Sequence, residues 1–252
     1  MNNTPGKIII VGASSGLGKA VAQTYARRGW IVGVCARREE ALRELADAFP
    51  TNVHWVTLDV TSLDCEERLR ELIDQVGGMD VILYAAGCGW NNPELKTQAD
   101  MRTVQTNVDG FTRIVNAAFK WFAKNNTPSG RRGSLCAITS IAGTKGIGIS
   151  ATYSASKRYQ TTYLQALSQL ANHQKVAITI TDIRPGFINT ALLDTTAHKY
   201  PMLMSVDYAA KRIVHAIDHR RKIAYIDWKW HVVVALWRCI PNFIWRHLKL
   251  NI

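Results

Sequence analysis

The strongest constraint on the fold is the regular alternation of short apolar, β-branched runs with longer amphipathic stretches. The apolar runs predict strands at Lys7–Val11, Ile31–Cys35, Val53–Leu58, Asp80–Tyr84, Ser134–Thr139, Val176–Ile183 and Ile223–Ile226. The amphipathic stretches predict helices near Leu17–Arg28, Glu39–Ala48, Cys65–Val76, Gln98–Lys124, Tyr153–Asn172 and Val206–His219. Strands that are apolar throughout and alternate with helices predict a single α/β domain, a doubly wound parallel sheet with helices on both faces.

A glycine-rich stretch joins the first predicted strand to the first predicted helix. It reads Gly12-Ala-Ser-Ser-Gly-Leu-Gly18, and its glycines let the backbone come close to a pyrophosphate. The amides at the start of the following helix would then face the phosphates. The residues that we expect to hold a dinucleotide here are Gly12, Ser14, Ser15, Gly16, Leu17 and Gly18. The alternative interpretation is a tight turn that needs glycine only for its backbone dihedral angles.

The end of the second predicted strand indicates which dinucleotide the chain prefers. A site for NAD usually has an acidic residue there, which accepts from the ribose 2′-hydroxyl, but the first acidic residue in this chain is Glu39. Arg37 and Arg38 come before it, and a guanidinium fork suits the 2′-phosphate of NADP(H). We favour Arg37, which lies nearer to the strand end. The alternative is a pair of surface arginines that contact nothing.

Polar residues also follow the fifth predicted strand. Ser140 comes directly after it, and Tyr153 and Lys157 stand four residues apart in the next predicted helix. Residues at i and i+4 share one face of a helix. Tyr153 and Lys157 would therefore point together toward the strand ends, where ligands bind in doubly wound sheets. Taken alone, the tyrosine–lysine pair also fits an exposed helix surface.

The order of these motifs resembles that of the short-chain dehydrogenase/reductase family. The glycine-rich stretch, Asn107, Ser140 and the tyrosine–lysine pair follow one another as they do in that family. The segment Arg184–Thr190 is similar to the one that follows the family's sixth strand, and the resemblance covers roughly residues 6–227. It implies a Rossmann fold and an NADP(H)-dependent oxidoreductase that interconverts a carbonyl and an alcohol by hydride transfer.

The same resemblance implies roles for four catalytic residues. Tyr153 would be the general acid in carbonyl reduction and the base in alcohol oxidation. Lys157 would lower the pKa of Tyr153 from its ordinary value of about 10, and would hold the nicotinamide ribose. Ser140 would donate to the substrate oxygen and orient it, and Asn107 would hold a water in the proton relay behind Lys157. Asn107, Tyr153 and Lys157 thus also count among the predicted cofactor contacts.

Further cofactor contacts follow from the resemblance, position by position. They are Asp59 and Val60 at the adenine, Ala86 and Gly87 over the cofactor, Pro185 and Gly186 after the sixth strand, and Ile188 and Thr190 at the carboxamide. The chain departs from the family pattern at Val11, where a threonine is usual, and at Tyr84 and Ala85, where two asparagines are usual. These departures change local hydrogen bonding and leave all four catalytic positions filled.

The stretch Ala191–Ser205 is the predicted substrate loop. It is rich in leucine and methionine, which favours a lipophilic or aromatic substrate, although methionines also serve as plain packing. Trp90, after the fourth predicted strand, would form another wall of the substrate site.

Residues 228–252 form a basic, aromatic-rich extension beyond the predicted domain at 1–227. From Lys211 onward the chain carries nine basic residues against two acidic ones. The longest apolar run, Val232–Trp237, is far shorter than the ~20 residues that span a bilayer. Two interpretations stay open. The extension lies on an anionic membrane surface as a peripheral segment, or it packs against its own domain or a partner subunit.

The net charge and the cysteines limit which partners, which cell compartment and which metal or disulfide sites we expect. The net charge is +12, which fits an anionic partner or a solvated basic face, but no nucleic-acid-binding motif is recognised, so we expect no nucleic acid partner. The five cysteines are scattered without a CxxC pair, which favours a reducing cytoplasm and neither disulfides nor a metal site. The resemblance implies a homodimer or homotetramer. The alternative function is a non-catalytic NADP(H)-binding sensor or scaffold of the same fold.

Overall fold

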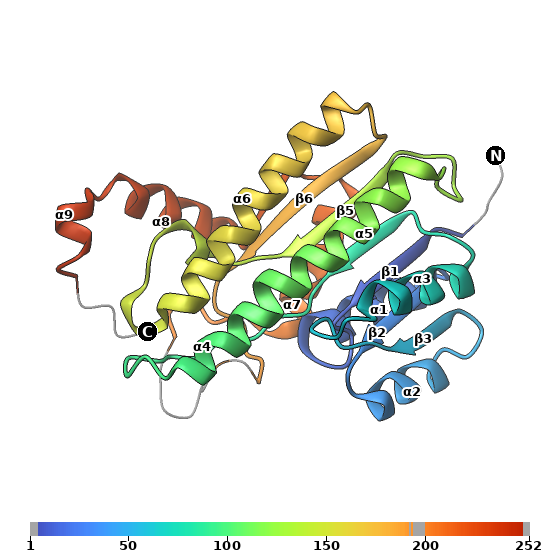
Figure 1. Ribbon diagram of the computed structural model, residues 1–252, viewed down its shortest axis with the longest axis horizontal. Helices are drawn as coiled ribbons and strands as arrows, with labels where there is room; N and C mark the ends of the chain where they lie inside the picture. Colours follow the sequence, from blue (N-terminus) through green and yellow to red (C-terminus); the bar gives the residue numbers. More distant parts are fainter. Residues whose placement is uncertain (1–4, 192, 194–199, 249–252) are drawn as a thin grey trace.

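The computed structural model describes residues 5–191, 193 and 200–248. In these residues the strands form one sheet in the order β3-β2-β1-β4-β5-β6-β7, and every neighbouring pair is parallel (Figure 1). The strands are β1 (Lys7–Val11), β2 (Ile31–Ala36), β3 (Val53–Thr57), β4 (Val81–Tyr84), β5 (Gly133–Ile138), β6 (Ile178–Pro185) and β7 (Ile223–Ile226). The strand order reverses between β1 and β4, which is where doubly wound sheets bind their ligands.

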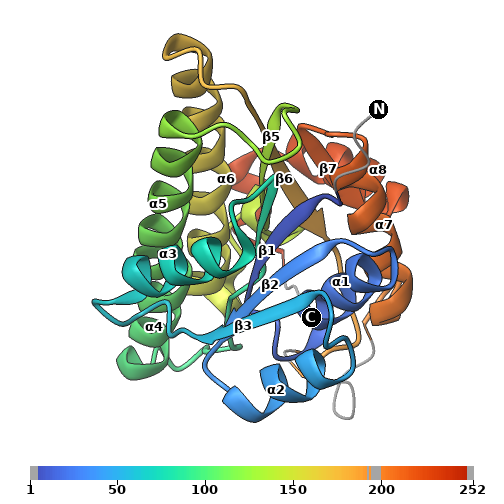
Figure 2. The same cartoon turned by 90° about the vertical axis from the view of Figure 1, so that its right-hand side faces the viewer.

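Helices cover both faces of the sheet, so the predicted doubly wound α/β fold is confirmed. One layer contains α1 (Gly16–Arg27), α2 (Glu39–Asp47), α7 (Val206–Asp218) and α8 (Trp228–Cys239). The other contains α3 (Cys65–Val76), α5 (Phe111–Lys124) and α6 (Ala151–His173). Figure 2 shows α3, α5 and α6 on one side of the strands and α1, α7 and α8 on the other.

The central strands are apolar throughout because both of their faces are covered. In β1, Ile8 and Ile10 belong to the core under α1 and α7, whereas Ile9 and Val11 belong to the core under α3 and α5. Successive side chains of a strand point to opposite faces of the sheet, so a doubly covered strand needs apolar residues at every position. This is the pattern from which the parallel sheet was predicted.

The structure differs from the sequence prediction in the long helix near residues 98–124. That stretch is divided into α4 (Thr97–Val104), a π-helical turn at Gln105–Gly110, and α5. The π-helical turn contains Asn107, and such turns widen a helix and are frequent at functional sites.

The sixth strand also begins later than predicted. The backbone amide of Val176 donates to the carbonyl of Ala171, at the end of α6, so Val176 belongs to the turn before β6. At its other end the strand continues to Pro185, which lies opposite Ile226 of β7. The extra residues carry β6 directly into the predicted cofactor segment.

The C-terminal extension contains α8 and the short helix α9 (Asn242–Trp245). Trp230 and Val234 of α8 are buried in the same core as α1 and α7. The first helix of the extension is thus attached to the sheet body, while the division at residue 227 stays a prediction. Within the described ranges, no helix combines the length and the apolar character that crossing a bilayer requires.

Candidate active site

The glycine-rich loop after β1 is packed too tightly to accept side chains. Gly12 has a φ of +92°, and a Cβ atom there would lie 2.5 Å from the backbone nitrogen of Ala86. At the start of α1, a Cβ on Gly18 would lie 2.2 Å from the carbonyl oxygen of Gly12. The loop therefore passes directly against the end of β4, and α1 begins directly above the loop. This arrangement provides the close backbone approach that a dinucleotide phosphate requires.

Arg38 lies over this loop. Its guanidinium donates to the hydroxyl of Ser14 at 3.0 and 3.2 Å and to the hydroxyl of Ser15 at 2.6 Å. Arg38 precedes the first residue of α2 and reaches back from there, whereas Arg37 is exposed beside it. The sequence analysis favoured Arg37, but the structure brings Arg38 to the predicted phosphate-binding residues.

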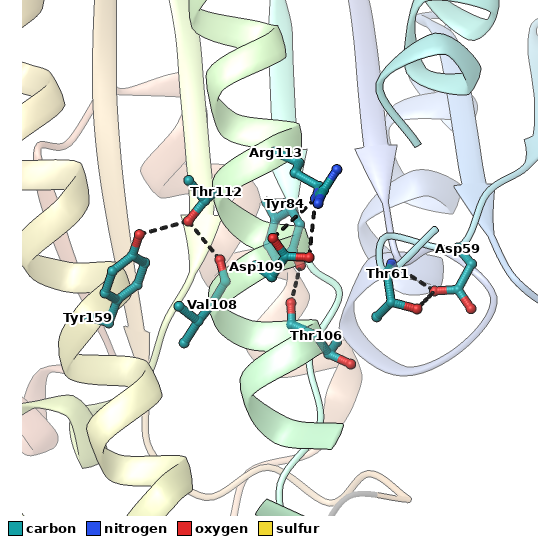
Figure 3. A network of polar contacts seen from close by, with 9 residues as sticks. All are labelled: Asp59, Thr61, Tyr84, Thr106, Val108, Asp109, Thr112, Arg113 and Tyr159. Atoms are coloured by element: carbon teal, nitrogen blue, oxygen red, sulfur yellow. Dashed lines mark hydrogen bonds and ion pairs between the residues drawn. The ribbon is translucent and has the colours of Figure 1, made fainter. Parts of the chain in front are cut away.

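Tyr84 shows how the chain replaces the asparagines that are usual at the end of β4. The Tyr84 ring is buried, and its hydroxyl donates at 2.9 Å to the carbonyl of Thr106 in the π-helical turn (Figure 3). The predicted adenine contacts lie close by. The carboxylate of Asp59 accepts from the amide and hydroxyl of Thr61, and a Cβ on Gly110 would lie 2.7 Å from the carbonyl of Val60. The hydroxyl of Tyr84 thus connects β4 with the π-helical turn, at a position where the family usually has an asparagine.

Asn107 connects the loop after β4 with α6. Its side-chain amide donates to the carbonyl of Cys88 at 2.7 Å and to the hydroxyl of Ser156 at 3.0 Å, and its Oδ1 accepts from the amide of Cys88. A Cβ on Gly87 would lie 3.4 Å from both Asn107 Oδ1 and Lys157 Nζ. The structure thus brings together Gly87, Asn107 and Lys157, three of the predicted site residues.

Tyr153 and Lys157 share the inner face of α6, as their spacing predicts. The Lys157 ammonium lies 5.8 Å from the centre of the Tyr153 ring and donates to the carbonyl of Ile138 and to Oε1 of Gln160, each at 3.1 Å. Lys157 is only 4% exposed, and burial lowers its pKa to about 8, although Cys88 and Asp182 act in the opposite direction.

The pKa of Tyr153 differs from the sequence-based expectation. Burial raises it above the ordinary value, and a hydrogen bond with Ser140 lowers it in part. The Lys157 ammonium donates to the Ile138 carbonyl and to the Gln160 amide, and burial remains the largest influence on the Tyr153 pKa. At neutral pH the Tyr153 phenol therefore keeps its proton, and Ser140 is the side chain that touches it.

Ser140 lies where β5 gives way to a short 3-10 turn, Ile141–Thr144. Its hydroxyl accepts from the amide of Ala142 at 3.1 Å, which fixes the side chain at the start of that turn. Since a serine hydroxyl can donate as well as accept, Ser140 can also donate a hydrogen bond beside the Tyr153 hydroxyl.

The segment after β6 approaches the glycine-rich loop. A Cβ on Gly16 would lie 3.6 Å from Cγ2 of Thr190, and Ile188 forms a parallel bridge with Met204. Gly186 faces the C-terminal extension, since a Cβ there would lie 2.0 Å from Nε1 of Trp230. The segment after β6 thus runs from α8 to the glycine-rich loop, and it contains Pro185, Gly186, Ile188 and Thr190. Of the predicted substrate loop, residues 192 and 194–199 lie outside the described residues.

Two residues at the site were missed by the sequence analysis. Gly89 lies against the Tyr153 ring, where a Cβ would be 2.2 Å from Cδ2, so no side chain fits at that position. Gln160 is fully buried, accepts from Lys157 and donates to the Asn107 carbonyl at 2.9 Å. The spacing of three residues from Lys157 is the signal that would have placed Gln160 on the same helix face.

Known proteins share both the sequence pattern and the fold. The pattern of the short chain dehydrogenase family matches residues 6–201. An uncharacterised oxidoreductase of Myxococcus xanthus is 31% identical over 240 residues, covering 93% of this chain and 92% of its own. An uncharacterised oxidoreductase of Mycobacterium tuberculosis is 31% identical over 253 residues, covering 95% and 96%.

Among solved structures, an alcohol dehydrogenase from the archaeon Thermococcus sibiricus, complexed with 5-hydroxy-NADP, superposes with a TM-score of 0.71. It is 22% identical in sequence, and the superposition covers 84% of this chain and 90% of that one, which shows a shared fold. The family match extends over most of the chain and includes the glycine-rich loop, Asn107, Ser140 and the Tyr153–Lys157 pair. This chain therefore belongs to the short-chain dehydrogenase family and is an oxidoreductase of that family.

Proposed function

We propose that this oxidoreductase interconverts a carbonyl and an alcohol with NADP(H) as cofactor. The observation that carries the proposal is that Ser140, Tyr153 and Lys157 lie together at the carboxyl end of the sheet, with Ser140 near enough to lower the pKa of Tyr153 and the Lys157 ammonium 5.8 Å from the centre of the Tyr153 ring. Two hydroxyls that converge on one point suit a single substrate oxygen. Such a pair has no function in a protein that only binds a dinucleotide, which is why the sensor or scaffold alternative is less well supported.

The residues of the site fit a bound NADP(H). Gly12 and Gly18 keep the loop free of side chains, so that its backbone could approach a pyrophosphate, and Arg38 adds a cation beside Ser14 and Ser15, where a 2′-phosphate would lie. Asp59 and Val60 follow β3 on the adenine side, and Gly87 leaves room beside Lys157 for the nicotinamide ribose. When bound, the cofactor supplies or accepts the hydride, which is the chemistry that side chains cannot provide.

The protein's own part in the reaction is to place the substrate oxygen and to move one proton. In reduction, the Tyr153 hydroxyl gives its proton to the oxygen of the carbonyl as the carbonyl carbon gains a hydride, and in oxidation the proton moves the other way. The Ser140 hydroxyl donates to the same oxygen and orients it. Lys157 then lies within reach of the charge that develops on Tyr153, and Asn107 holds the loop after β4 against α6.

The substrate in this proposal is a lipophilic small molecule. Met202 and Leu203, which belong to the predicted substrate loop, are each 39% exposed, and Trp90 after β4 is 48% exposed. Aromatic and aliphatic side chains of this kind line sites for apolar ligands. The proposal also includes that the protein is a homo-oligomer and that it is located in the cytoplasm.

A substrate panel tests the proposed function. The purified chain is mixed with NADPH and, in turn, with ketones, aldehydes, quinones and 3-oxoacyl thioesters, and the loss of absorbance from NADPH is followed. We expect turnover with at least one apolar carbonyl compound, and slower turnover with NADH. Tight binding of NADPH without turnover of any carbonyl or of the matching alcohols would favour the sensor or scaffold alternative.

A further inference from the structure

Helix α8 is apolar on two opposite faces, and only one of them is covered. On the inner face, Trp230 and Val234 are 3% and 1% exposed. On the outer face, Trp228, Val232 and Leu236 are 63%, 50% and 67% exposed. These three follow one another at intervals of four residues, so they form one continuous stripe along the helix. An apolar face of a helix normally packs against a partner.

The outer stripe continues into α9 and is surrounded by positive charge. Phe243 is 66% exposed and Ile244 44% exposed, so the apolar surface extends past the end of α8. The exposed basic residues around it are Lys229, Arg238 and Arg246. The sequence from residue 228 to its end contains no aspartate or glutamate. Asp227 precedes the stripe, and its carboxylate accepts from the Lys229 amide and the Tyr208 hydroxyl. An apolar stripe bordered mainly by cations is complementary to a layer of anionic headgroups over hydrocarbon.

The stripe lies at the end of the molecule that holds the proposed active site. Trp237 donates through Nε1 to the hydroxyl of Thr144 at 2.8 Å, and Trp245 donates to the carbonyl of Gly146 at 2.7 Å. Lys145 lies between them, with its ammonium donating to the carbonyl of Ile240. Residues 144–146 follow Ser140 and precede Tyr153 in the chain. Figure 1 shows α8 and α9 at the end of the sheet toward which the strands point.

We propose that the outer stripe of α8 and α9 docks this enzyme onto an anionic lipid surface. Trp228, Val232, Leu236 and Phe243 enter the interface, and Lys229, Arg238 and Arg246 meet the headgroup phosphates. Tryptophan favours the headgroup layer, and the stems of lysine and arginine lie along apolar surface while their charges reach outward.

A second copy of the chain is a less suitable occupant of this face. In a two-fold contact the same surface meets itself, so Lys229, Arg238 and Arg246 of one copy would approach a surface that carries the same three cations. Like charges that approach within a few ångströms repel one another, and this segment has no carboxylate to offset them. An anionic lipid surface removes that repulsion and covers the same apolar residues.

Vesicle co-sedimentation tests the docking surface on the full chain. Phosphatidylcholine vesicles with and without phosphatidylserine are pelleted at low and high salt, and the protein is measured in both fractions. We expect binding to the anionic vesicles at low salt and release at high salt. Changing Trp228, Val232, Leu236 and Phe243 together to serine should weaken the partition roughly 100-fold or more, because most of the buried apolar surface is lost.

The control keeps the fold and the charge but changes apolar residues elsewhere. Leu63 and Leu170, 85% and 39% exposed, are changed to glutamine, and this variant should pellet like the unchanged chain. Thermal melting checks that both variants are folded. A full chain that stays in the supernatant with anionic vesicles at low salt overturns the proposal. So does a dimer in sedimentation velocity that the serine variant converts to a monomer, since a second copy then covers the stripe.

A separate set of contacts concerns Gln160, three residues after Lys157 on α6. Its Oε1 accepts from the Lys157 ammonium at 3.1 Å, and its Nε2 donates to the Asn107 carbonyl at 2.9 Å. Gln160 is fully buried, so both of its polar atoms depend on these partners. The sequence analysis expected Asn107 to hold a water in the proton relay behind Lys157. In the structure the Gln160 amide connects the Asn107 carbonyl with the Lys157 ammonium.

We infer that Gln160 is a positioning residue, which holds the Lys157 ammonium in place by linking it to the π-helical turn. The inference deepens the proposed function and rests on it. The groups that face Lys157 from other elements are Cys88, after β4, and Asp182, in β6, both of which favour the ammonium form. Tyr153 faces it from its own helix. Gln160 adds an acceptor to this set without adding a charge.

Two substitutions at Gln160 should move the titration of Lys157 in opposite directions. Gln160→Leu removes the acceptor and should lower the pKa of Lys157 further, by about one pH unit, whereas Gln160→Glu adds a carboxylate and should raise it. The titration is read by NMR of 13C-labelled lysine, with Lys157→Met to identify the signal. Where substrate is turned over, the basic limb of the pH–rate profile should move in the same sense.

The NMR measurement keeps this inference separate from the proposed function. If neither substitution at Gln160 moves the Lys157 signal in folded protein, the positioning role is wrong. If the signal moves as expected but no carbonyl compound is turned over, the positioning role stands and the proposed reaction fails.

Discussion

Tyr153→Phe is expected to lower the rate of carbonyl reduction by at least 10²–10⁴-fold, the usual contribution of general acid–base catalysis. The substitution keeps the ring that packs against Gly89 and removes only the hydroxyl that contacts Ser140. The loss should appear in kcat, because the proton is transferred after the substrate has bound. The Kd for NADPH, measured by fluorescence titration, should change little.

A matched control is available on the same helix. Tyr159 is half-buried, and its hydroxyl shares a hydrogen bond of 2.8 Å with the hydroxyl of Thr112 on α5 (Figure 3). Tyr159→Phe also removes one hydroxyl and one hydrogen bond, so it should change the melting temperature about as much and leave kcat nearly intact. Comparable kcat values for the Tyr153 and Tyr159 variants would remove Tyr153 from the reaction.

The parallel sheet could be predicted from the sequence because its signal is local. Ile8, Ile9 and Ile10 are consecutive and apolar, and a strand with this pattern needs cover on both faces. The pair Tyr153 and Lys157 is local in the same sense, since helix geometry alone places both on one face. The spacing of Tyr153 and Lys157 alone therefore predicts the face of α6 that both residues share in the structure.

The features that escaped prediction depend on contacts between distant segments. The partner of Tyr84 is the carbonyl of Thr106, which is available because a π-helical turn interrupts the helix, and periodicity does not distinguish such a turn from α-helix. Burial decides the pKa of Tyr153, and burial is a property of the packed molecule. The pKa of Tyr153 is raised rather than lowered because burial outweighs the other influences, although the Lys157 ammonium lies 5.8 Å from the ring.

Helix α8 escaped prediction for a different reason. A helix with apolar residues on two opposite faces shows no single favoured face in its sequence, so composition alone did not separate the membrane interpretation from packing on the domain. The structure shows the packing on the domain, and membrane contact stays a proposal. Trp230 packs inward against Gly186, and Trp228 points outward. The inner face supports the cofactor segment, while the outer face remains for another partner.

Arg38→Ala is expected to weaken NADPH binding by about 10- to 100-fold, because a hydrogen-bonded charge is removed from the 2′-phosphate site. NADH lacks that phosphate, so its Kd should hardly change, and this constancy also shows that Ser14 and Ser15 keep the loop in shape without Arg38. Arg37→Ala is the matched control, because it removes the same charge from the neighbouring position.

The two single variants show which arginine contributes more to NADPH binding, Arg37 as the sequence analysis favoured or Arg38 as the structure favours. A larger loss with Arg38→Ala follows from its bonds to Ser14 and Ser15, and a larger loss with Arg37→Ala would restore the original preference. Equal Kd values for NADPH and NADH in the unchanged chain would contradict both. Ala36→Asp combined with Arg38→Ala should reverse the cofactor preference, since a carboxylate at the end of β2 accepts from a ribose 2′-hydroxyl and repels a 2′-phosphate.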